Sequence, residues 1–377
     1  VVDTGIAYEN YNQNSTKRYY LAPDLAGTTF VPGYDFVNND THPNDDNSHG
    51  THVTGTIAQS TNNNLGVAGV AFGASIMPVK VLDASGSGSY ANVANGIIWA
   101  TDNGAKVINL SLGGSSPSIT LENALAYAYS KGVTIVAAAG NSSSATPSYP
   151  AGYDAYVISV GATRYDETLA SYSNYGPSVD LVAPGGDLSV DQNHDNYPDG
   201  ILQNTFNPNT LNTSDFSYWF FQGTSMASPH VAGVAALLIA KGVVGPDAVR
   251  NILQSTAKNL GTSGRDNTYG WGRVNATAAL NAVSTVPDVT PPSQPTGLTA
   301  TAVSSSQINL SWNPSTDDVA VAGYRIYRDS LLIATVPTPS YADTGLIPVT
   351  LYSYQVSAID AVPNESLKSV PPATATT

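Results

Sequence analysis

Apolar runs alternate with helix-like segments over the first three quarters of the chain. The strand-like runs cover residues 76–83, 106–114, 133–141 and 155–163, and helix-like segments cover residues 90–104 and 118–132. Alternation of this kind is typical of βαβ units. We therefore predict an α/β domain over residues 1–286, with a doubly wound, mostly parallel sheet. In such sheets functional groups gather at the carboxyl ends of the strands.

The first residues, "VVDTG", resemble the end of a buried strand. We expect the start of that strand to lie outside this chain, so that the strand is incomplete here. A carboxylate at this position, Asp3, needs a hydrogen-bonding partner because an isolated buried charge is costly.

The pattern changes after residue 286. Residues 287–295, "PDVTPPSQP", are proline-rich and predict a linker. Residues 296–377 contain short β-type runs at regular spacing with turn residues between them. This second pattern predicts a small antiparallel β-sandwich.

Composition excludes several classes of function. The net charge of −14, from 28 acidic and 14 basic residues, argues against nucleic acid or anionic membranes as partners. The chain has no cysteine, so disulfides and cysteine-based zinc sites are impossible. Its longest apolar run, near residue 231, is about ten residues and too short for a membrane span. Stability must therefore come from packing or bound ions, and the acidic, polar surface suits a secreted protein.

One stretch, "FFQGTSMASPH" at residues 220–230, places two serines and a histidine before an apolar helical run. Ser225 taken alone is most simply a helix cap. Ser225 and His230 are five residues apart, so a helix separates them by about 140° around its axis. His230 is therefore a poor base for Ser225, and a nucleophilic Ser225 needs a base from elsewhere.

The stretch "DNSHGTHVTGTIA" at residues 46–58 offers that base. His49 and His52 are three residues apart and lead into a helix-like segment. Two such histidines also fit a metal site or a core position, but no glutamate follows His49 as in H-E-x-x-H. Asp3, His49 and Ser225 together supply an orienting acid, a base and a nucleophile.

Four blocks carry a family resemblance: "VVDTG", "NSHGTHVTGTIA", "AAAGNS" and "GTSMASPHVAGVAALL". They resemble, in order and spacing, the signature blocks of the subtilisin family of serine proteases. The resemblance covers about residues 1–285 and implies Ser225 as nucleophile, His49 as general base and Asp3 as the orienting carboxylate. It also implies the Asn141 side chain and the Ser225 N–H as oxyanion donors. It assigns neither His52 nor His230 to catalysis.

The resemblance also implies where substrate binds. Two edge segments, residues 85–89 and 111–114, match those that clamp an extended peptide, and their glycines allow close backbone approach. The expected substrate-binding residues are Gly86, Ser87, Gly88, Ser111, Leu112, Gly113, Ala138, Ala139, Gly140 and Ser148. The primary pocket has no charged residue nearby and is expected to accept large apolar or aromatic side chains.

Two loops are expected to bind calcium. Residues 60–70, "STNNNLGVAGV", resemble the family's high-affinity calcium loop. The ligands implied there are the Asp24 and Asn63 side chains and the carbonyls of Thr61, Leu65 and Val67. A further ligand of the family falls before residue 1.

The second loop, "DQNHDNYPDG" at residues 191–200, lies in an insertion of the 185–222 region. Oxygen ligands fall at EF-hand-like positions, from Asp191, Asn193, Asp195, the Tyr197 carbonyl and Asp199. Position 6 is asparagine rather than glycine, and position 12 is leucine rather than glutamate, so a polar surface loop remains the alternative.

Residues 296–377 resemble a fibronectin type III domain. Trp312 and Tyr324 match its core aromatics, and Leu346, Pro348 and Tyr352 match its tyrosine corner. The expected role is a spacer, or attachment to a polymer or cell-surface ligand. The whole chain is thus expected to be a secreted, monomeric, calcium-stabilised serine endopeptidase, and the alternative is a binding or adhesion protein that retains a protease fold.

Overall fold

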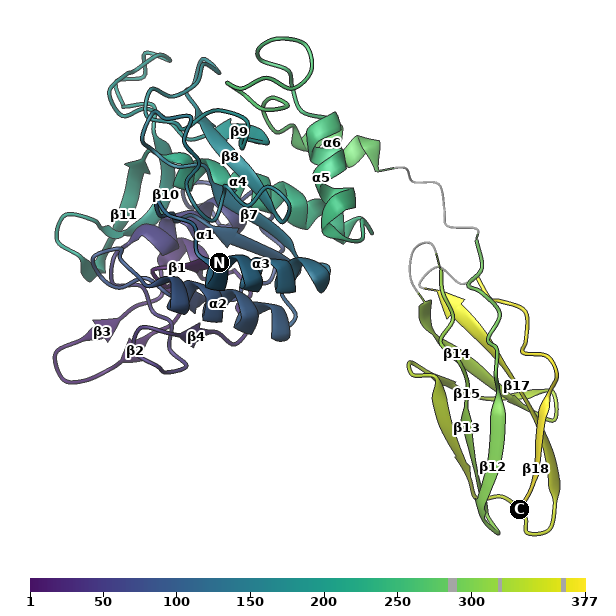
Figure 1. Cartoon of the computed structure of the whole chain (residues 1–377). Coiled ribbons are helices and arrows are strands. Elements are labelled where there is room, and N and C mark those ends of the chain that lie inside the picture. The colour runs from purple at the N-terminus through teal and green to yellow at the C-terminus, as the bar shows by residue number, and fades with distance from the viewer. Residues whose placement is uncertain (284–289, 318–320, 361–363) are drawn as a thin grey trace. The chain divides into compact units, whose positions relative to one another are not determined.

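The computed structural model describes the whole chain except residues 284–289, 318–320 and 361–363 (Figure 1). The chain forms two compact units, Val1–Val283 and Ser284–Thr377. Part of the predicted linker, residues 287–289, lies outside the described residues. Residues 290–295 are described and contain no helix or strand.

A four-stranded parallel sheet forms the centre of the first unit. Its strand order is β6-β7-β8-β9, and all neighbouring strands are parallel. These strands are β6 (Val107–Leu110), β7 (Thr134–Ala138), β8 (Val157–Thr163) and β9 (Leu181–Pro184). A second parallel sheet has the order β1-β5-β4. Its strands are β1 (Val2–Asp3), β5 (Val79–Lys80) and β4 (Tyr34–Asp35). The predicted parallel α/β fold is confirmed.

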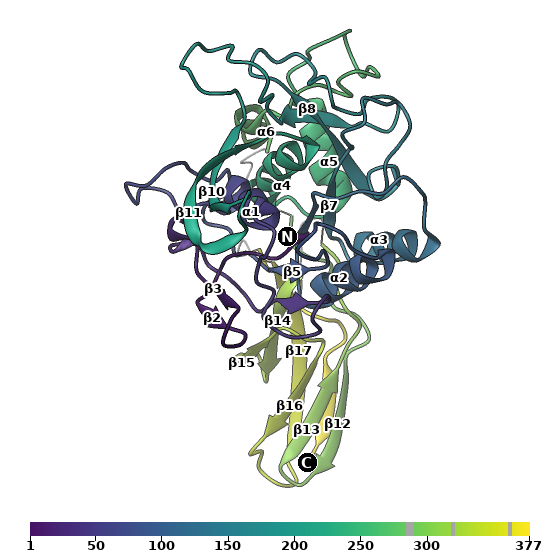
Figure 2. The ribbon, with the colours of Figure 1, turned by 90° about the vertical axis from the view of Figure 1, so that its left-hand side faces the viewer.

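Helices pack against both faces of the larger sheet, as Figure 2 shows. The helices of the first unit are α1 (His49–Ala58), α2 (Tyr90–Asp102), α3 (Ile119–Ser130), α4 (Thr224–Ala240), α5 (Pro246–Ser255) and α6 (Ala276–Ala282), besides the 3-10 helix η1 (Pro23–Leu25). Of these, α3, α4 and α5 contact the larger sheet directly. One core cluster joins α4 and α1 to the sheet, and another joins α2 and α3 to it. Because both faces are covered, the strands are almost wholly buried, which explains their continuous apolar runs.

Two hairpins complete the first unit. The shorter pairs β2 (Tyr11–Asn12) with β3 (Arg18–Tyr19). The longer pairs β10 (Ile201–Asn207) with β11 (Asn212–Phe221) and packs against α1. The long hairpin lies in the insertion found in the sequence and leads directly into α4. It therefore connects the surface insertion to the helix that carries Ser225.

The second unit is an antiparallel β-sandwich. One sheet has the order β12-β13-β16 and the other β15-β14-β17-β18. The strands are β12 (Thr299–Ser304), β13 (Gln307–Ser311), β14 (Val321–Arg328), β15 (Leu331–Val336), β16 (Ser340–Thr344), β17 (Leu351–Asp360) and β18 (Ala373–Thr376). Trp312 and Tyr324 meet edge to face in its core, and the Tyr352 hydroxyl accepts a hydrogen bond from Ile347 N–H. The predicted sandwich is confirmed.

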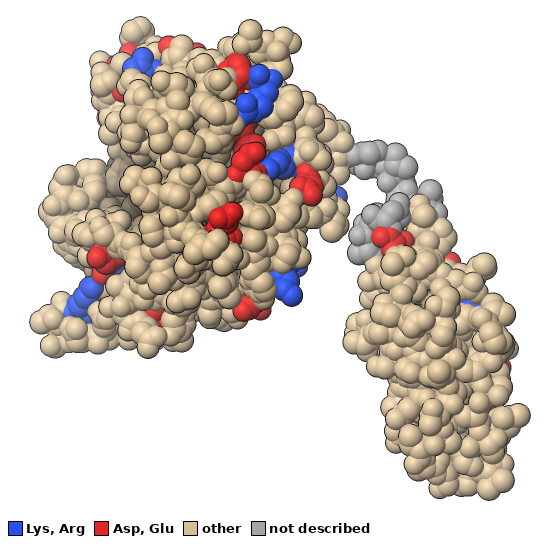
Figure 3. All heavy atoms as spheres, in the orientation of Figure 1, with Lys and Arg blue, Asp and Glu red and all other residues tan. Residues whose placement is uncertain are grey.

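Charged side chains are sparse on the surface. Figure 3 shows one face of the molecule, where lysine, arginine, aspartate and glutamate are scattered rather than gathered into a patch. No helix in the described part of the chain is long and apolar enough to cross a membrane.

Candidate active site

Asp3 and His49 meet at the carboxyl end of β1. Asp3 ends β1 and is fully buried, and His49 is the first residue of α1. Asp3 Oδ1 lies 2.7 Å from His49 Nδ1 and also accepts a 2.7 Å hydrogen bond from Thr4 N–H. Because a carboxylate only accepts, Nδ1 carries the proton and Nε2 is left as the basic nitrogen of the ring.

Opposing effects set the basicity of His49. Burial disfavours the charged imidazolium, but the negative charge of Asp3, its hydrogen bond and the charge of Asp45 together outweigh burial and raise the pKa of His49. The ring is therefore a stronger base than a free imidazole.

A buried aspartate that the sequence analysis missed holds the start of α1. Asp45 accepts hydrogen bonds from the backbone N–H groups of Asn47, Ser48 and Thr51 and from the Thr51 hydroxyl. The Thr4 hydroxyl donates to the same carboxylate at 2.9 Å. Asp45 thus links the residue after Asp3 to the turn that presents His49. The sequence does contain a signal for this role, because acidic residues precede the predicted helix in "NDDNSHG", as is typical of a helix N-terminus.

Ser225 lies in the first turn of α4. The helix begins at Thr224, and the N-cap is Gly223 with φ 145°, so Ser225 is not the capping residue. The first helical N–H groups have no acceptor within the helix, which leaves the Ser225 N–H available. The Ser225 hydroxyl donates to the Ser111 carbonyl at 3.2 Å. Among the described residues, no hydrogen bond joins Ser225 to His49.

Asn141 is held beside Ser225 by Thr224. Asn141 Oδ1 accepts hydrogen bonds from Thr224 N–H at 2.8 Å and from the Thr224 hydroxyl at 2.9 Å. The Thr224 hydroxyl also accepts from Gly140 N–H at 3.1 Å. With its oxygen fixed in this way, the exposed Asn141 side chain keeps its two Nδ2 hydrogens free for a ligand.

Two adjoining hollows flank these residues. One is lined by His49, by residues 85–88 and by Ser111, Leu112 and Gly113. The other, of about 390 Å³, is lined by Ala138, Gly140, Asn141, Ser148 and Ser225. Residues 112–115 line both hollows, so the predicted edge segments, His49 and Ser225 border one continuous cleft.

Close packing explains two glycines of this cleft. A Cβ at Gly113 would lie 2.6 Å from Ser148 Oγ. Gly140 has a φ of 107°, and a Cβ there would lie 2.5 Å from Asn174 Nδ2. Ala139 differs from the expectation, because its side chain packs in a small core cluster with Val179 and Val182 rather than lining the hollow.

The other two histidines of the motifs are anchored elsewhere. His52 is fully buried, and its Nε2–H donates to the Ile201 and Trp219 carbonyls at 3.0 Å each. Its ring stacks on Phe221 with centroids 4.1 Å apart, and burial lowers its pKa to about 3. His230 Nδ1–H donates to the Met226 carbonyl within α4. His52 therefore fastens the long hairpin to α1 as a neutral ring.

The first predicted calcium loop surrounds a buried carboxylate. Asp24 is fully buried, and its oxygens accept hydrogen bonds from Asn63 Nδ2 and Gln59 Nε2 at 2.5 Å each and from the Tyr218 hydroxyl at 2.9 Å. Gln59 and Tyr218 were not predicted, and Tyr218 comes from the distant long hairpin. The other expected ligands, Thr61, Leu65 and Val67, lie in the irregular segment that follows Gln59.

The second predicted calcium loop turns its oxygens toward its own backbone. Asp191 accepts hydrogen bonds from the N–H groups of Asp195 and Asn196, and Asp195 accepts from Tyr197 N–H. Asp199 accepts from Gln192 N–H, and Asn193 donates to the Asp195 carboxylate. Over the described residues, no group of three or more His, Cys, Asp or Glu side chains is close enough to hold a metal. As arranged here, the oxygens of this second loop do not fit a calcium ion.

Comparison with known proteins identifies the family of this chain. Residues 1–272 match the model of the subtilase family, peptidase S8. The chain belongs to the subtilase family. Residues 293–371 match the fibronectin type III domain.

Curated relatives of this subtilase include a protein named as a serine proteinase and a protein named as a subtilisin. It is 43% identical over 280 residues to the "Thermophilic serine proteinase" of Bacillus sp. (strain AK1) and 42% identical over 280 residues to "Thermitase" of Thermoactinomyces vulgaris. It is 44% identical over 283 residues to "Subtilisin Savinase" of Lederbergia lenta. These matches each cover 74% of the subtilase and, respectively, 60%, 87% and 88% of the relative. The chain therefore spans less than two thirds of the first relative's length.

Solved structures give the same assignment. The subtilase resembles proteases from Pseudoalteromonas arctica with a TM-score of 0.64 and 34% identity, over 75% of its own length and 88% of theirs. It resembles a cold-adapted subtilisin-like serine proteinase with a TM-score of 0.56 and 33% identity, over 73% and 85% of the two chains.

Proposed function

We propose that this subtilase is an endopeptidase in which Ser225 attacks the peptide carbonyl. The 2.7 Å hydrogen bond from His49 Nδ1–H to the buried Asp3 carboxylate supports this function best. It orients the ring, selects the tautomer with a basic Nε2 and stabilises the imidazolium that forms during attack.

Attack requires the Ser225 hydroxyl to turn from the Ser111 carbonyl toward His49 Nε2. The imidazole takes the hydroxyl proton as Oγ bonds to the substrate carbon, and then delivers it to the leaving amine. The oxyanion accepts hydrogen bonds from Asn141 Nδ2 and from the Ser225 N–H at the start of α4. Water activated by His49 then releases the acyl group by the reverse sequence.

Labelling with a serine-directed phosphonyl fluoride tests this assignment. The reagent should abolish hydrolysis of casein and modify Ser225, as peptide mass mapping would show. A Ser225→Ala variant should neither react nor cleave casein. Modification at another residue, or casein hydrolysis by the Ser225→Ala variant, would disprove the role of Ser225.

We infer a preference for large apolar or aromatic side chains before the scissile bond. The hollow beside Ser225 is lined by no charged side chain among the described residues. An apolar side chain would gain from leaving water there, whereas a charged one would lose hydration without a partner. Chromogenic tetrapeptides ending in phenylalanine, lysine or glutamate test this, and equal kcat/KM values for the three would exclude it.

The residues around Asp24 fit a calcium ion in part. Asp24 is fully buried, its hydrogen-bond partners are all neutral, and no ion pair among the described residues involves it. A cation would supply the missing charge. The Asn63 amide has its nitrogen rather than its oxygen toward Asp24 and would have to flip to act as a ligand. We propose that Asp24, Asn63 and the carbonyls of Thr61, Leu65 and Val67 hold a structural calcium ion.

We also propose that the protein acts outside the cell and that its type III unit serves as a spacer or attachment module. An endopeptidase with an open, uncharged cleft would damage proteins in the compartment where it is made. Fractionation of the producing culture tests the location, and deletion of residues 287–377 tests whether the second unit affects binding to insoluble substrates but not cleavage of small peptides.

A further inference from the structure

Three buried polar side chains connect strand β6 to the nucleophile helix α4. Asn109 lies in β6, Ser111 directly follows that strand, and Ser228 lies in α4 one turn after Ser225. Ser228 Oγ–H donates to Asn109 Oδ1 at 2.7 Å, and Asn109 Nδ2–H donates to Ser111 Oγ at 3.0 Å. Ser111 Oγ–H in turn donates to the Ser225 carbonyl at 2.8 Å.

These bonds form a closed ring, because Ser225 and Ser228 belong to the same helix. Each hydroxyl has one donated bond with a defined acceptor, and the Asn109 amide uses both its oxygen and its nitrogen. Ser225 and Ser111 also bond reciprocally, since the Ser225 hydroxyl donates to the Ser111 carbonyl. The ring thus determines how far along β6 the first turn of α4 lies, and with it the place of the Ser225 backbone.

The side chains of this hydrogen-bond ring are buried, which makes each hydrogen bond costly to lose. Asn109, Ser111 and Ser228 are 2%, 3% and 0% exposed. Water cannot replace a lost partner easily in such surroundings, so each group strongly favours the arrangement in which all are satisfied. Neither His49 nor Asp3 bonds to the ring.

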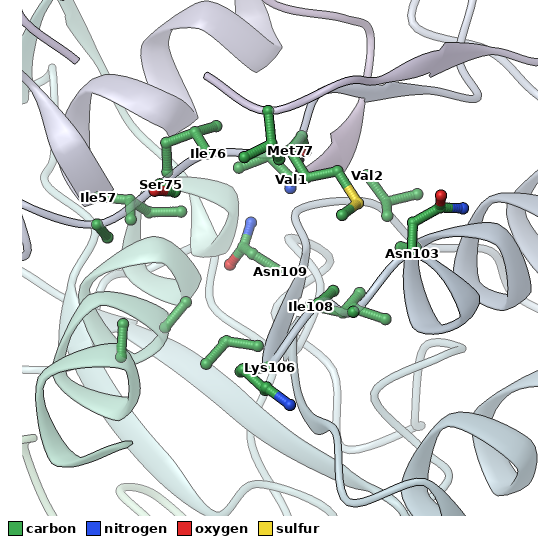
Figure 4. Close-up of a pocket in the computed structure, with 18 of the residues that line it drawn as sticks. Val1, Val2, Ile57, Ser75, Ile76, Met77, Asn103, Lys106, Ile108 and Asn109 are labelled. Atoms are coloured by element: carbon green, nitrogen blue, oxygen red, sulfur yellow. Dashed lines mark hydrogen bonds between the residues drawn. The ribbon is translucent and has the colours of Figure 1, made fainter. Parts of the chain in front are cut away.

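Figure 4 shows the other side of Asn109. There it borders an apolar hollow of about 490 Å³ whose lining includes Ile57, Met77 and Ile108. Asn109 is still only 2% exposed, so its amide finds its polar partners in the two hydrogen bonds of the ring rather than in solvent.

We propose that Asn109 is a positioning residue for the nucleophile and acts through Ser111 and Ser228. The inference rests on the proposed function of Ser225. When the Ser225 hydroxyl leaves the Ser111 carbonyl to meet His49, the bond from Ser111 Oγ–H to the Ser225 carbonyl remains. The backbone of the nucleophile, including the N–H that faces the oxyanion, therefore stays in place while the hydroxyl turns.

Single substitutions in the full chain test the ring. Ser111→Ala, Ser228→Ala and Asn109→Ala each remove one or two of its bonds, and Ser159→Ala is the matched control. Ser159 is also buried at the central sheet, but its hydroxyl has no hydrogen-bond partner in the described structure. The rate of labelling by a phosphonyl fluoride should fall about tenfold or more in the ring variants, because small displacements of reacting groups are costly. The Ser159→Ala rate should stay within about twofold of the unaltered rate.

Peptide hydrolysis separates positioning from substrate binding and from general stability. We expect kcat to fall in all three variants while the pH midpoint of kcat/KM stays unchanged, with assays run well below each melting temperature. KM should stay unchanged in Asn109→Ala and Ser228→Ala, whose residues do not line the substrate cleft. An unchanged labelling rate in folded Ser111→Ala, or an equal loss in Ser159→Ala, would overturn the inference. A shifted pH midpoint would also overturn it, by placing the effect on His49.

Failure of the inference differs from failure of the proposed function. If Ser225→Ala still cleaves peptides, the nucleophile is wrong. If Ser225→Ala is inactive but the ring variants are labelled at the normal rate, only the positioning role is wrong. If Asn109→Ala does not fold, Ser111→Ala decides the question, because it removes one hydroxyl and leaves the Asn109–Ser228 bond in place.

Discussion

Two aspartates of the first unit are equally buried but have different partners. Asp3 and Asp24 are both 0% exposed. Asp3 faces an ionisable ring, His49, and its second oxygen has no hydrogen-bond partner in the described structure. Asp24 has both oxygens occupied by neutral donors from Gln59, Asn63 and Tyr218.

The difference separates a chemical role from a structural one. A buried carboxylate beside a titratable imidazole gains its counter-charge when the imidazole takes a proton, so its charge can serve catalysis. A buried carboxylate among neutral donors never gains a counter-charge from the protein, so its charge favours a bound cation. The same residue type at the same burial thus has two functions that reciprocal substitutions can separate.

Replacing Asp3 should produce the largest effect. Asp3→Asn should lower kcat about 10⁴-fold, because an asparagine cannot stabilise the imidazolium and favours the wrong tautomer. Asp24→Asn, assayed with calcium below its melting temperature, should keep kcat within a few-fold of the unaltered value. Steady-state kinetics on a chromogenic peptide measures both, and a comparable loss in the two variants would contradict the separation.

Removing calcium should act on the other aspartate. Occupancy at a thousandfold excess over Kd stabilises the native state by about 4 kcal/mol. That corresponds to a melting temperature roughly 10 °C lower in chelator. Asp3→Asn should keep this response, and Asp24→Asn should lose it. A melting temperature of the unaltered protein that is insensitive to chelator would exclude the proposed calcium site at Asp24.

A smaller effect concerns the pKa of His49, which Asp3 raises and which Asp3→Asn should lower. The raised pKa means that the neutral, basic form is lost as pH falls through a midpoint above about 6.5. In Asp3→Asn the main raising cause is gone and burial remains, so the midpoint should drop. NMR titration of the ring in a Ser225→Ala background measures both midpoints, with His49→Gln identifying the signal. Equal midpoints with and without Asp3 would show that Asp3 does not control the base.

Sequence patterns predicted the parts of this molecule that depend on local order. The alternation of strands and helices predicted the parallel sheet, and the four blocks predicted the family. The roles of Asp3, His49 and Ser225 remain predictions that the labelling and substitution experiments test.

Long-range contacts could not be predicted in the same way. Tyr218 reaches Asp24 across 194 residues, through a hairpin whose packing depends on His52 and Phe221. The hydrogen-bond ring around Asn109 joins residues that are 119 positions apart. Neither contact has a motif, because the partners are set by how elements pack rather than by spacing along the chain. The N-cap of α4 was expected at Ser225 but is Gly223, since a glycine tolerates the φ of 145° found there.

The smallest predicted effect concerns Tyr218. Tyr218→Phe removes one hydrogen bond to the buried Asp24 carboxylate and keeps the aromatic ring of the side chain. In chelator, the substitution should lower the free energy of unfolding by about 1–3 kcal/mol, because a hydrogen bond to a charged group is stronger than one between neutral groups. Calcium should reduce that loss, since a cation supplies the carboxylate with a stronger partner. Denaturant titrations with and without calcium measure the difference, and Tyr197→Phe, on the exposed loop, is the matched control. A loss of stability that is the same in calcium and in chelator would show that no cation binds the Asp24 carboxylate.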